Sequence, residues 1–152
     1  MDIQSALKKD FRTFRIVWWS MLASVLVYAF IVELLKIQHA PFKGFSPFPE
    51  MHLLKYALLA MSVLSIGIIA ILRTILLRDL GNKPFGKALE KLKLAHLITW
   101  AICEAPAIYG LVLFLVGGFY EEFYMLLTLS LILLAIYRPQ YTRWEELLAD
   151  KG

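Results

Sequence analysis

Four long apolar runs dominate the pattern of hydrophobic and polar positions along the chain. They extend over residues 16–35, 53–77, 95–116 and 119–137. Each is close to the roughly 20 helical residues that cross a bilayer core of about 30 Å, and none alternates polar and apolar positions as a half-buried strand does. Because only helices satisfy their own backbone groups in lipid without closing into a barrel, we predict an all-α, polytopic membrane protein with four transmembrane helices.

The composition supports this prediction and sets one other class aside. Of the 152 residues, 60% are hydrophobic, and the mean hydropathy is +0.67, whereas a soluble domain is about 45–50% apolar. The net charge of +4 is compatible with nucleic-acid binding, but the basic residues flank the apolar runs, as they do when they control membrane topology. We therefore predict a lipid bilayer as partner and no nucleic acid.

The distribution of basic residues predicts the orientation. All but three of the 16 Lys and Arg residues lie before the first run, around the second loop or after the fourth run; the exceptions are Lys36, Lys43 and Lys55. Positively charged loops stay on the cytoplasmic side, so both termini are expected inside, in a prokaryotic cytoplasmic (inner) membrane. Residues 16–138 then form the membrane domain, and residues 139–152 form a cytoplasmic tail in which 141–149 could be a short amphipathic helix.

Residues 1–15 combine an apolar and a basic face at helical spacing. The basic face consists of Lys8, Lys9, Arg12 and Arg15, opposite Ile3, Leu7, Phe11 and Phe14. This pattern predicts an amphipathic cytoplasmic-surface helix on the anionic inner leaflet; a solvated start to the first span explains it equally well. In the second loop, Asn82 and Pro84 are suited to the start of a helix, so the second and third spans are expected to form a tight antiparallel hairpin.

Glu104 is a carboxylate within the third apolar run. An ionised carboxylate there costs at least about 2.5–3.5 kcal/mol, so it either packs against a polar partner or gains and loses a proton. If residues at equal distances from the loop face each other in the hairpin (level pairing), Glu104 lies opposite Ser62 and Ser65. Either hydroxyl, or the carbonyl of Ile102 that Pro106 leaves without its helical partner, could hold the carboxyl proton. The nearby residues Ala101, Ala105, Pro106 and Gly110 are predicted to serve close helix packing.

The residues that follow the glutamate resemble a known family. Glu104 and Ala105, then Ile108-Tyr109-Gly110-Leu111-Val112, are similar to the outer helix of ATP synthase subunit c, the rotor proteolipid, and the hairpin covering residues 53–118 has the same topology. The resemblance implies that Glu104 is the ion-carrying carboxyl and that Tyr109 completes its hydrogen-bonding shell. Because Ala105 offers no hydroxyl, the resemblance also implies protons rather than sodium.

Other kinds of site find little support in the sequence. Cys103 is the single cysteine, so an intramolecular disulfide and a Cys/His zinc site are excluded. No nucleophile–base arrangement or phosphate-binding loop is present, so neither an enzyme, a cofactor nor a metal is predicted. Glu33 forms either an ion pair with Lys36 or a second proton site, and Arg73 either reaches the inner leaflet or helps to discharge a carboxyl.

Three functional hypotheses follow. In the first, a proteolipid-like protein binds a proton at Glu104 within a proton-handling membrane complex. In the second, the protein is a non-enzymatic accessory subunit that docks on partner transmembrane helices with no ion movement. Both imply other membrane subunits or further copies of this chain as partners. A third reading, a regulator at the lipid surface, would depend on residues 2–15.

Overall fold

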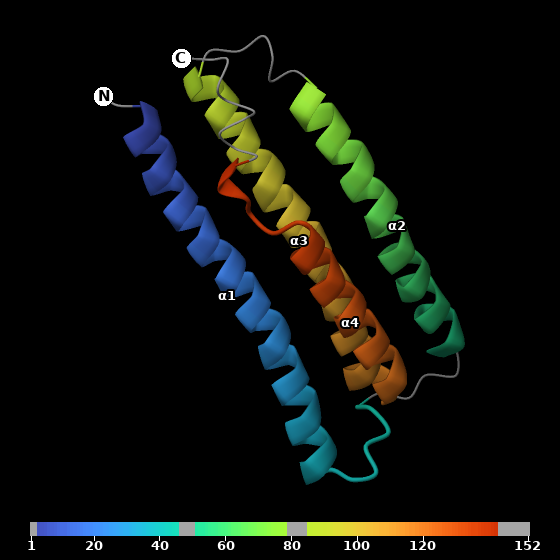
Figure 1. The fold of residues 1–152 in the computed structure, drawn as a ribbon. Coiled ribbons are helices and arrows are strands. Elements are labelled where there is room, and N and C mark those ends of the chain that lie inside the picture. The colour runs from blue at the N-terminus through green and yellow to red at the C-terminus, as the bar shows by residue number, and fades with distance from the viewer. Residues whose placement is uncertain (1–2, 46–50, 79–84, 143–152) are drawn as a thin grey trace.

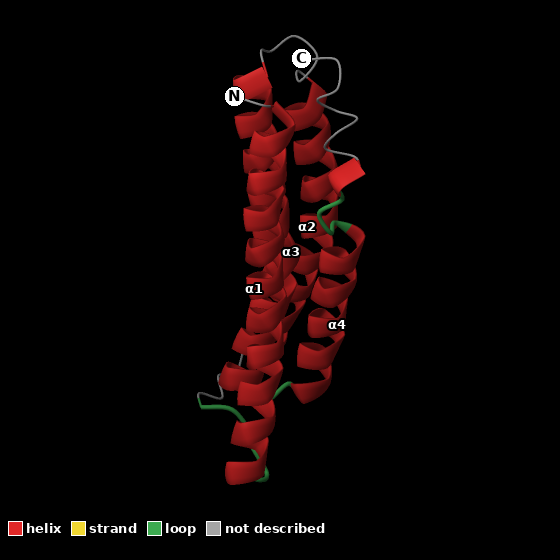
Figure 2. Cartoon of the chain, turned by 60° about the vertical axis from the view of Figure 1, so that its left-hand side comes forward, coloured by secondary structure: helices red, strands yellow, loops and turns green. Residues whose placement is uncertain are grey.

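The computed structural model describes residues 3–45, 51–78 and 85–142, and four α-helices account for nearly all of them (Figure 1). The helices are α1 (Ile3–Gln38), α2 (Met51–Arg78), α3 (Phe85–Gly117) and α4 (Tyr120–Ile136). No strand occurs within these described ranges (Figure 2). The all-α prediction is thereby confirmed. Asn82, Pro84 and residues 143–149, on which two of the local predictions depended, lie outside the described residues.

Three of the helices are long and apolar enough to cross a membrane. The qualifying segments are Lys8–Gln38, Met51–Arg78 and Gly86–Gly117. Helix α4 has 17 residues, which gives it a length of about 25 Å. Residues 3–15 do not form a helix of their own, because α1 continues without a break from Ile3 into the first apolar run. The predicted surface helix is therefore an extension of the first span.

Helix α3 is the centre of the bundle. Helices α2 and α4 pack extensively on it, and α1 contacts both α3 and α4 (Figure 1). With 33 residues, α3 is about twice as long as α4, so α4 covers only its C-terminal part (Figure 2). The fully buried side chains Trp100, Phe114 and Phe123 belong to α3 and α4, which places the densest packing between these two helices.

Helix α1 contacts the bundle along a narrow stripe. Its buried and half-buried apolar residues recur at alternating steps of three and four and include Phe11, Phe14, Trp18, Met21, Val25, Tyr28, Val32 and Leu35. This spacing is the seam of left-handed helix packing. Large apolar side chains on the rest of the helix, such as Trp19, Leu26 and Phe30, are exposed, as expected for a surface that faces lipid.

The described part of the loop between α1 and α2 is attached to the end of α3. The backbone N–H of Phe45 donates to the carbonyl of Leu115 at 2.8 Å, and the ring of Phe42 stacks on Phe114 with 4.7 Å between centroids. Gly118, in the turn to α4, has φ +69°, a conformation that favours glycine. The loop and the turn therefore form one closely packed end of the bundle.

Candidate functional site

Glu104 lies half-buried on the side of α3 that faces α1. Its Oε1 atom accepts hydrogen bonds from Ser24 Oγ at 2.6 Å and from Tyr28 Oη at 2.7 Å. Ser24 and Tyr28 are four residues apart on α1, so they occupy the same helix face. The carboxyl group therefore has two hydroxyl partners, both supplied by the first helix of the chain.

Ser24 has a second hydrogen-bond acceptor within reach. Its Oγ also lies 2.9 Å from the backbone carbonyl of Met21. A serine hydroxyl carries one hydrogen and two acceptor lone pairs, so it cannot donate fully to both oxygens. When Ser24 donates to the Met21 carbonyl, its oxygen becomes an acceptor for a proton carried by Glu104.

Ser62 and Ser65, the partners predicted from level pairing, are not joined to the glutamate by their hydroxyls. Both are buried, and they donate to the carbonyls of Leu58 and Met61 in their own helix at 2.8 and 2.9 Å. Level pairing estimates height along two helices, but it does not fix which side of α3 a residue occupies. The two serines instead provide small buried side chains on α2, which let two helices approach closely.

Tyr109, which the family resemblance places in the shell of the carboxyl, is half-buried on α3. Among the described residues, the hydroxyl partners of Glu104 are Ser24 and Tyr28. A separation of five residues turns Tyr109 about 140° round the helix from Glu104. Tyr28 thus occupies the position that was expected of Tyr109. The sequence signal for this site was the presence of Ser24 and Tyr28, spaced by four, within the first apolar run.

The predicted packing residues differ in what they contact. Pro106 is buried and α3 continues through it, while one turn away Ser130 Oγ of α4 donates to the carbonyl of Cys103 at 2.6 Å. A Cβ atom on Gly110 would lie 3.1 Å from the backbone oxygen of Phe123, so α3 and α4 touch closely there. Ala105 is half-buried, whereas Ala101 is exposed and does not contribute to the interior.

Two tryptophans mark the end of α4 nearest the basic residues. Trp18 Nε1 donates to the carbonyl of Leu134 at 3.1 Å, and Trp100 Nε1 donates to the carbonyl of Tyr137 at 2.8 Å. These carbonyls belong to the last turn, which has no intrahelical donors. The guanidinium of Arg73 lies 5.0 Å from the centre of the Tyr137 ring, where a cation also complements the helix dipole.

The position of Glu104 along the bundle axis can be estimated from the two ends of α4. Ser130 is level with Cys103 because the two are hydrogen-bonded. Ser130 lies ten residues from Tyr120 and seven from Tyr137, or about 15 and 10 Å along the helix axis. The carboxyl is therefore well inside the segment that α4 covers, closer to the end marked by the two tryptophans.

A second carboxyl group, Glu33, lies near the opposite end of α4. Its Oε1 accepts hydrogen bonds from Tyr120 Oη at 2.5 Å and from Tyr124 Oη at 2.6 Å. The ammonium group of Lys36 lies 3.6 Å from the centre of the Tyr120 ring, which is a close cation–π contact. Two tyrosines of α4 therefore stabilise the Glu33 carboxylate by hydrogen bonds, and the positive charge of Lys36 lies close by.

The other charged groups of the site region connect helices or face outward. Lys55 of α2 forms an ion pair with Glu122 of α4. Lys8, Lys9, Arg12 and Arg15 of the predicted membrane-surface set are exposed along the first turns of α1. Within the described ranges, no three His, Cys, Asp or Glu side chains come together in a way that could hold a metal ion.

No protein family model, no curated protein and no solved structure matches this chain. The local resemblance of residues 104–112 to the rotor proteolipid remains a prediction.

Proposed function

We propose that this chain is a small integral membrane protein that reversibly binds one proton at Glu104, between α1 and α3, within a larger proton-handling membrane complex. One observation carries the proposal: Glu104 Oε1 contacts two hydroxyl groups, and one of them, Ser24, has a second acceptor of its own. The site can therefore form hydrogen bonds with either protonation state of the carboxyl group.

The two states differ by little more than the rotation of one hydroxyl group. The ionised carboxylate accepts hydrogen bonds from both Ser24 and Tyr28. The protonated carboxyl donates to Ser24 Oγ, Ser24 turns its hydrogen to the carbonyl of Met21, and Tyr28 continues to donate. A buried polar group that loses its partner costs about 1–3 kcal/mol. Because neither state leaves a group unpaired, a proton can enter and leave without repacking the helices.

The surroundings of the site fit a membrane setting. The N-terminal ends of α1 and α3 and the C-terminal end of α2 lie at one end of the bundle (Figure 1), where most basic residues occur. Positive charge predicts that this end is cytoplasmic. Helix α4, with 17 residues, reaches the lower limit for a spanning helix, and we take it as the fourth span. Both termini are then inside, in a prokaryotic inner membrane.

The resemblance to the rotor proteolipid supports the same chemistry but not the same architecture. It implies that Glu104 carries a proton, while both hydroxyl partners of Glu104 come from α1, outside the resembling hairpin of residues 53–118. Here the chain's own first helix closes the site. The proposal therefore retains the proton-binding carboxyl and not a place in a rotating ring.

Reaction with a hydrophobic carbodiimide tests the proposal, because such reagents attack protonated carboxyl groups in lipid. In proteoliposomes we expect peptide mass spectrometry to find the label on Glu104 and the label to disappear in Glu104→Gln. Glu121→Gln is the matched control, since Glu121 is exposed, and it should leave the labelling unchanged. If Glu104 stays unlabelled at every pH between about 5 and 9, the proposal fails.

A second candidate function is a structural accessory subunit in which no ion moves. It is favoured by the position of α1, whose seam is attached by side-chain hydrogen bonds at three levels: Trp18, Glu104 and Glu33. In this case the carboxyl serves only to hold α1 on α3. Gln at position 104 keeps a hydrogen-bonding group but cannot release a proton. Intact assembly with lost proton-linked activity supports the carrier, and unchanged activity supports the accessory subunit.

A further inference from the structure

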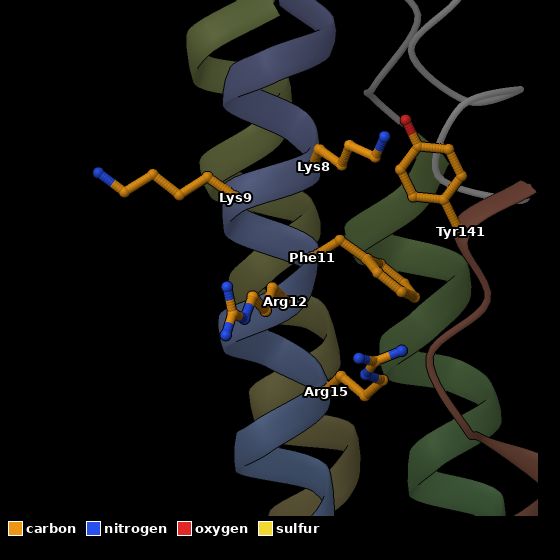
Figure 3. Close-up of a pocket in the computed structure, with 6 residues that line it drawn as sticks. All are labelled: Lys8, Lys9, Phe11, Arg12, Arg15 and Tyr141. Carbon is orange, nitrogen blue, oxygen red and sulfur yellow. The ribbon is translucent and has the colours of Figure 1, made fainter.

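A pocket with a strongly basic lining lies beside the N-terminal part of α1. It has a volume of about 620 Å³ and is lined by Lys8, Lys9, Phe11, Arg12, Arg15 and Tyr141 (Figure 3). Four of the six lining residues carry a positive charge, and none carries a negative one. The nearby Asp10 is engaged elsewhere, in an ion pair of 2.5 Å with Lys93 of α3.

The lining has a defined arrangement rather than being a scattered set of charges. Lys8, Phe11 and Arg15 are spaced by three and four residues and share one face of α1. Figure 3 shows Lys8 and Arg15 reaching from this face on either side of Phe11, toward the segment that carries Tyr141. The rings of Phe11 and Tyr141 meet edge-on, with 5.3 Å between centroids. The aromatic pair thus holds the far wall of the pocket in place.

The depth of the pocket relates it to the membrane surface. Arg15 is three residues, or about 5 Å along the axis, before Trp18, which binds the last turn of α4. Lys8 is about 10 Å further out. The polar headgroup layer occupies roughly 5–7 Å on each side of the hydrocarbon core. With α4 as a span, the backbone of Arg15 lies within this layer. The backbone of Lys8 lies several ångströms beyond it, and its long side chain can reach back toward the layer.

We propose that this pocket binds the headgroup phosphate of one anionic phospholipid from the adjoining leaflet. The guanidinium of Arg15 suits a phosphate because its planar fork can donate two parallel hydrogen bonds. Lys8 adds a mobile point charge, and the Tyr141 hydroxyl adds a neutral donor. The exposed apolar side chains below, such as Ile16 and Trp19, provide a surface for the acyl chains. A free anion would make only the polar half of these contacts.

Native mass spectrometry of the full-length protein, released from a membrane mimetic with added phosphatidylglycerol, tests the proposal. We expect one tightly retained anionic lipid per chain on the wild type, and no equivalent retention of phosphatidylcholine. In Lys8→Gln/Arg15→Gln the apparent affinity should fall about 30-fold, since each basic group near the surface contributes about fivefold.

The control is Lys87→Gln/Arg138→Gln. It removes the same number of Lys and Arg charges at the same end of the bundle, from exposed positions that do not line the pocket. We expect its lipid retention to stay within about threefold of the wild type, because neither side chain lines the pocket and exposed charges are screened by salt. Equal losses in the two double variants would overturn a specific site and leave only diffuse attraction.

Two further outcomes are informative. If inorganic phosphate at millimolar concentration displaces the lipid, or is itself retained in its absence, the ligand is a soluble anion and the lipid proposal is wrong. An unchanged helical circular dichroism signal and melting profile in Lys8→Gln/Arg15→Gln exclude misfolding as the cause of lost binding. The proposal does not depend on proton exchange at Glu104, so carbodiimide labelling and lipid retention can fail independently.

Discussion

Tyr28 of α1 donates a 2.7 Å hydrogen bond to Glu104 of α3, which lies 76 residues further along the chain. The contact connects the helix that packs least extensively in the bundle to the helix at its centre. Two roles converge in one bond, because it both attaches α1 and sets the environment of a carboxyl group inside an apolar span. The variants below separate the two roles.

The structural role predicts a coupling energy between Tyr28 and Glu104. In a double-mutant cycle of Tyr28→Phe and Glu104→Leu, we expect about 0.6–1.7 kcal/mol of coupling, from the mean to the maximum measured for hydrogen bonds between transmembrane helices. The measurement is reversible unfolding in mixed detergent micelles. The same cycle with Tyr56→Phe, an exposed tyrosine of α2, should give none. Coupling of similar size in both cycles would show that the Tyr28 contact has no particular role.

The chemical role predicts that Tyr28→Phe increases carbodiimide labelling of Glu104. A hydrogen bond to a charged group contributes about 1 kcal/mol more than one to a neutral group, so losing the tyrosine donor destabilises the ionised carboxylate more than the protonated acid. We expect labelling about fivefold faster at the highest pH at which the wild type still reacts. Ser62→Ala, which removes a buried hydroxyl bound to the carbonyl of Leu58, should leave the rate unchanged. A slower rate in Tyr28→Phe would contradict the assigned geometry.

The tryptophan caps of α4 make a separate prediction. Trp100→Phe removes the donor to the carbonyl of Tyr137 and the five-membered ring of a fully buried side chain. We expect a loss of at least about 1 kcal/mol in the free energy of unfolding in detergent, because the lost hydrogen bond and the cavity both destabilise. Trp19→Phe is the control, because Trp19 is exposed. Equal effects of the two substitutions would show that the indole–carbonyl bond does not stabilise the end of α4.

The apolar pattern was sufficient to predict the helices, and it could not predict which faces of them meet. Residues 16–35 were predicted as the first span and residues 1–15 as a surface helix or a start to that span; the pattern left open that both form one continuous helix from Ile3. Its heptad-like seam is present in the sequence, but large apolar residues occur on all sides of a helix in lipid. In a helix surrounded by lipid, the spacing of hydrophobic residues therefore does not show which face packs in the bundle and which face is exposed.

The candidate site shows the same limit more sharply. Glu104 could be identified from sequence because a carboxylate in an apolar run is costly wherever it points. Its partners could not, because they depend on the rotation of α3 and on a helix distant in the chain. The polar residues of the first span were a better guide to the partners of Glu104 than level pairing. Ser24 and Tyr28 are spaced by four, so both can donate hydrogen bonds to one carboxyl group from the same helix face.

Gly110 and Gly67 form a matched pair for testing the packing of the bundle. A Cβ atom at Gly110 would meet Phe123 and Leu126 of α4 at 3.1–3.2 Å, whereas one at Gly67 would meet nothing within 4 Å. We expect Gly110→Ala to cost about 1–3 kcal/mol through overpacking. Gly67→Ala should be neutral or stabilising by up to about 1 kcal/mol, because Ala is the better helix former. Thermal unfolding in detergent measures both, and a Gly110→Ala variant as stable as Gly67→Ala would place α4 further from α3.

The orientation in the membrane can be tested with single cysteines. The natural thiol, Cys103, is buried, and Cys103→Ala removes it from the assay. In that background we expect Lys43→Cys, in the outer loop, to react with a membrane-impermeant maleimide on intact spheroplasts, and Lys87→Cys to react only after the membrane is opened. Both positions are exposed, so access to the reagent depends on the side of the membrane and not on burial. The prediction rests on the excess of basic residues at the end of the bundle that carries Lys87.

The reverse labelling pattern would invert the orientation and place the basic pocket at Lys8 and Arg15 on the outer surface. Labelling of both cysteines on intact cells would contradict a hairpin in which α2 crosses the membrane between them.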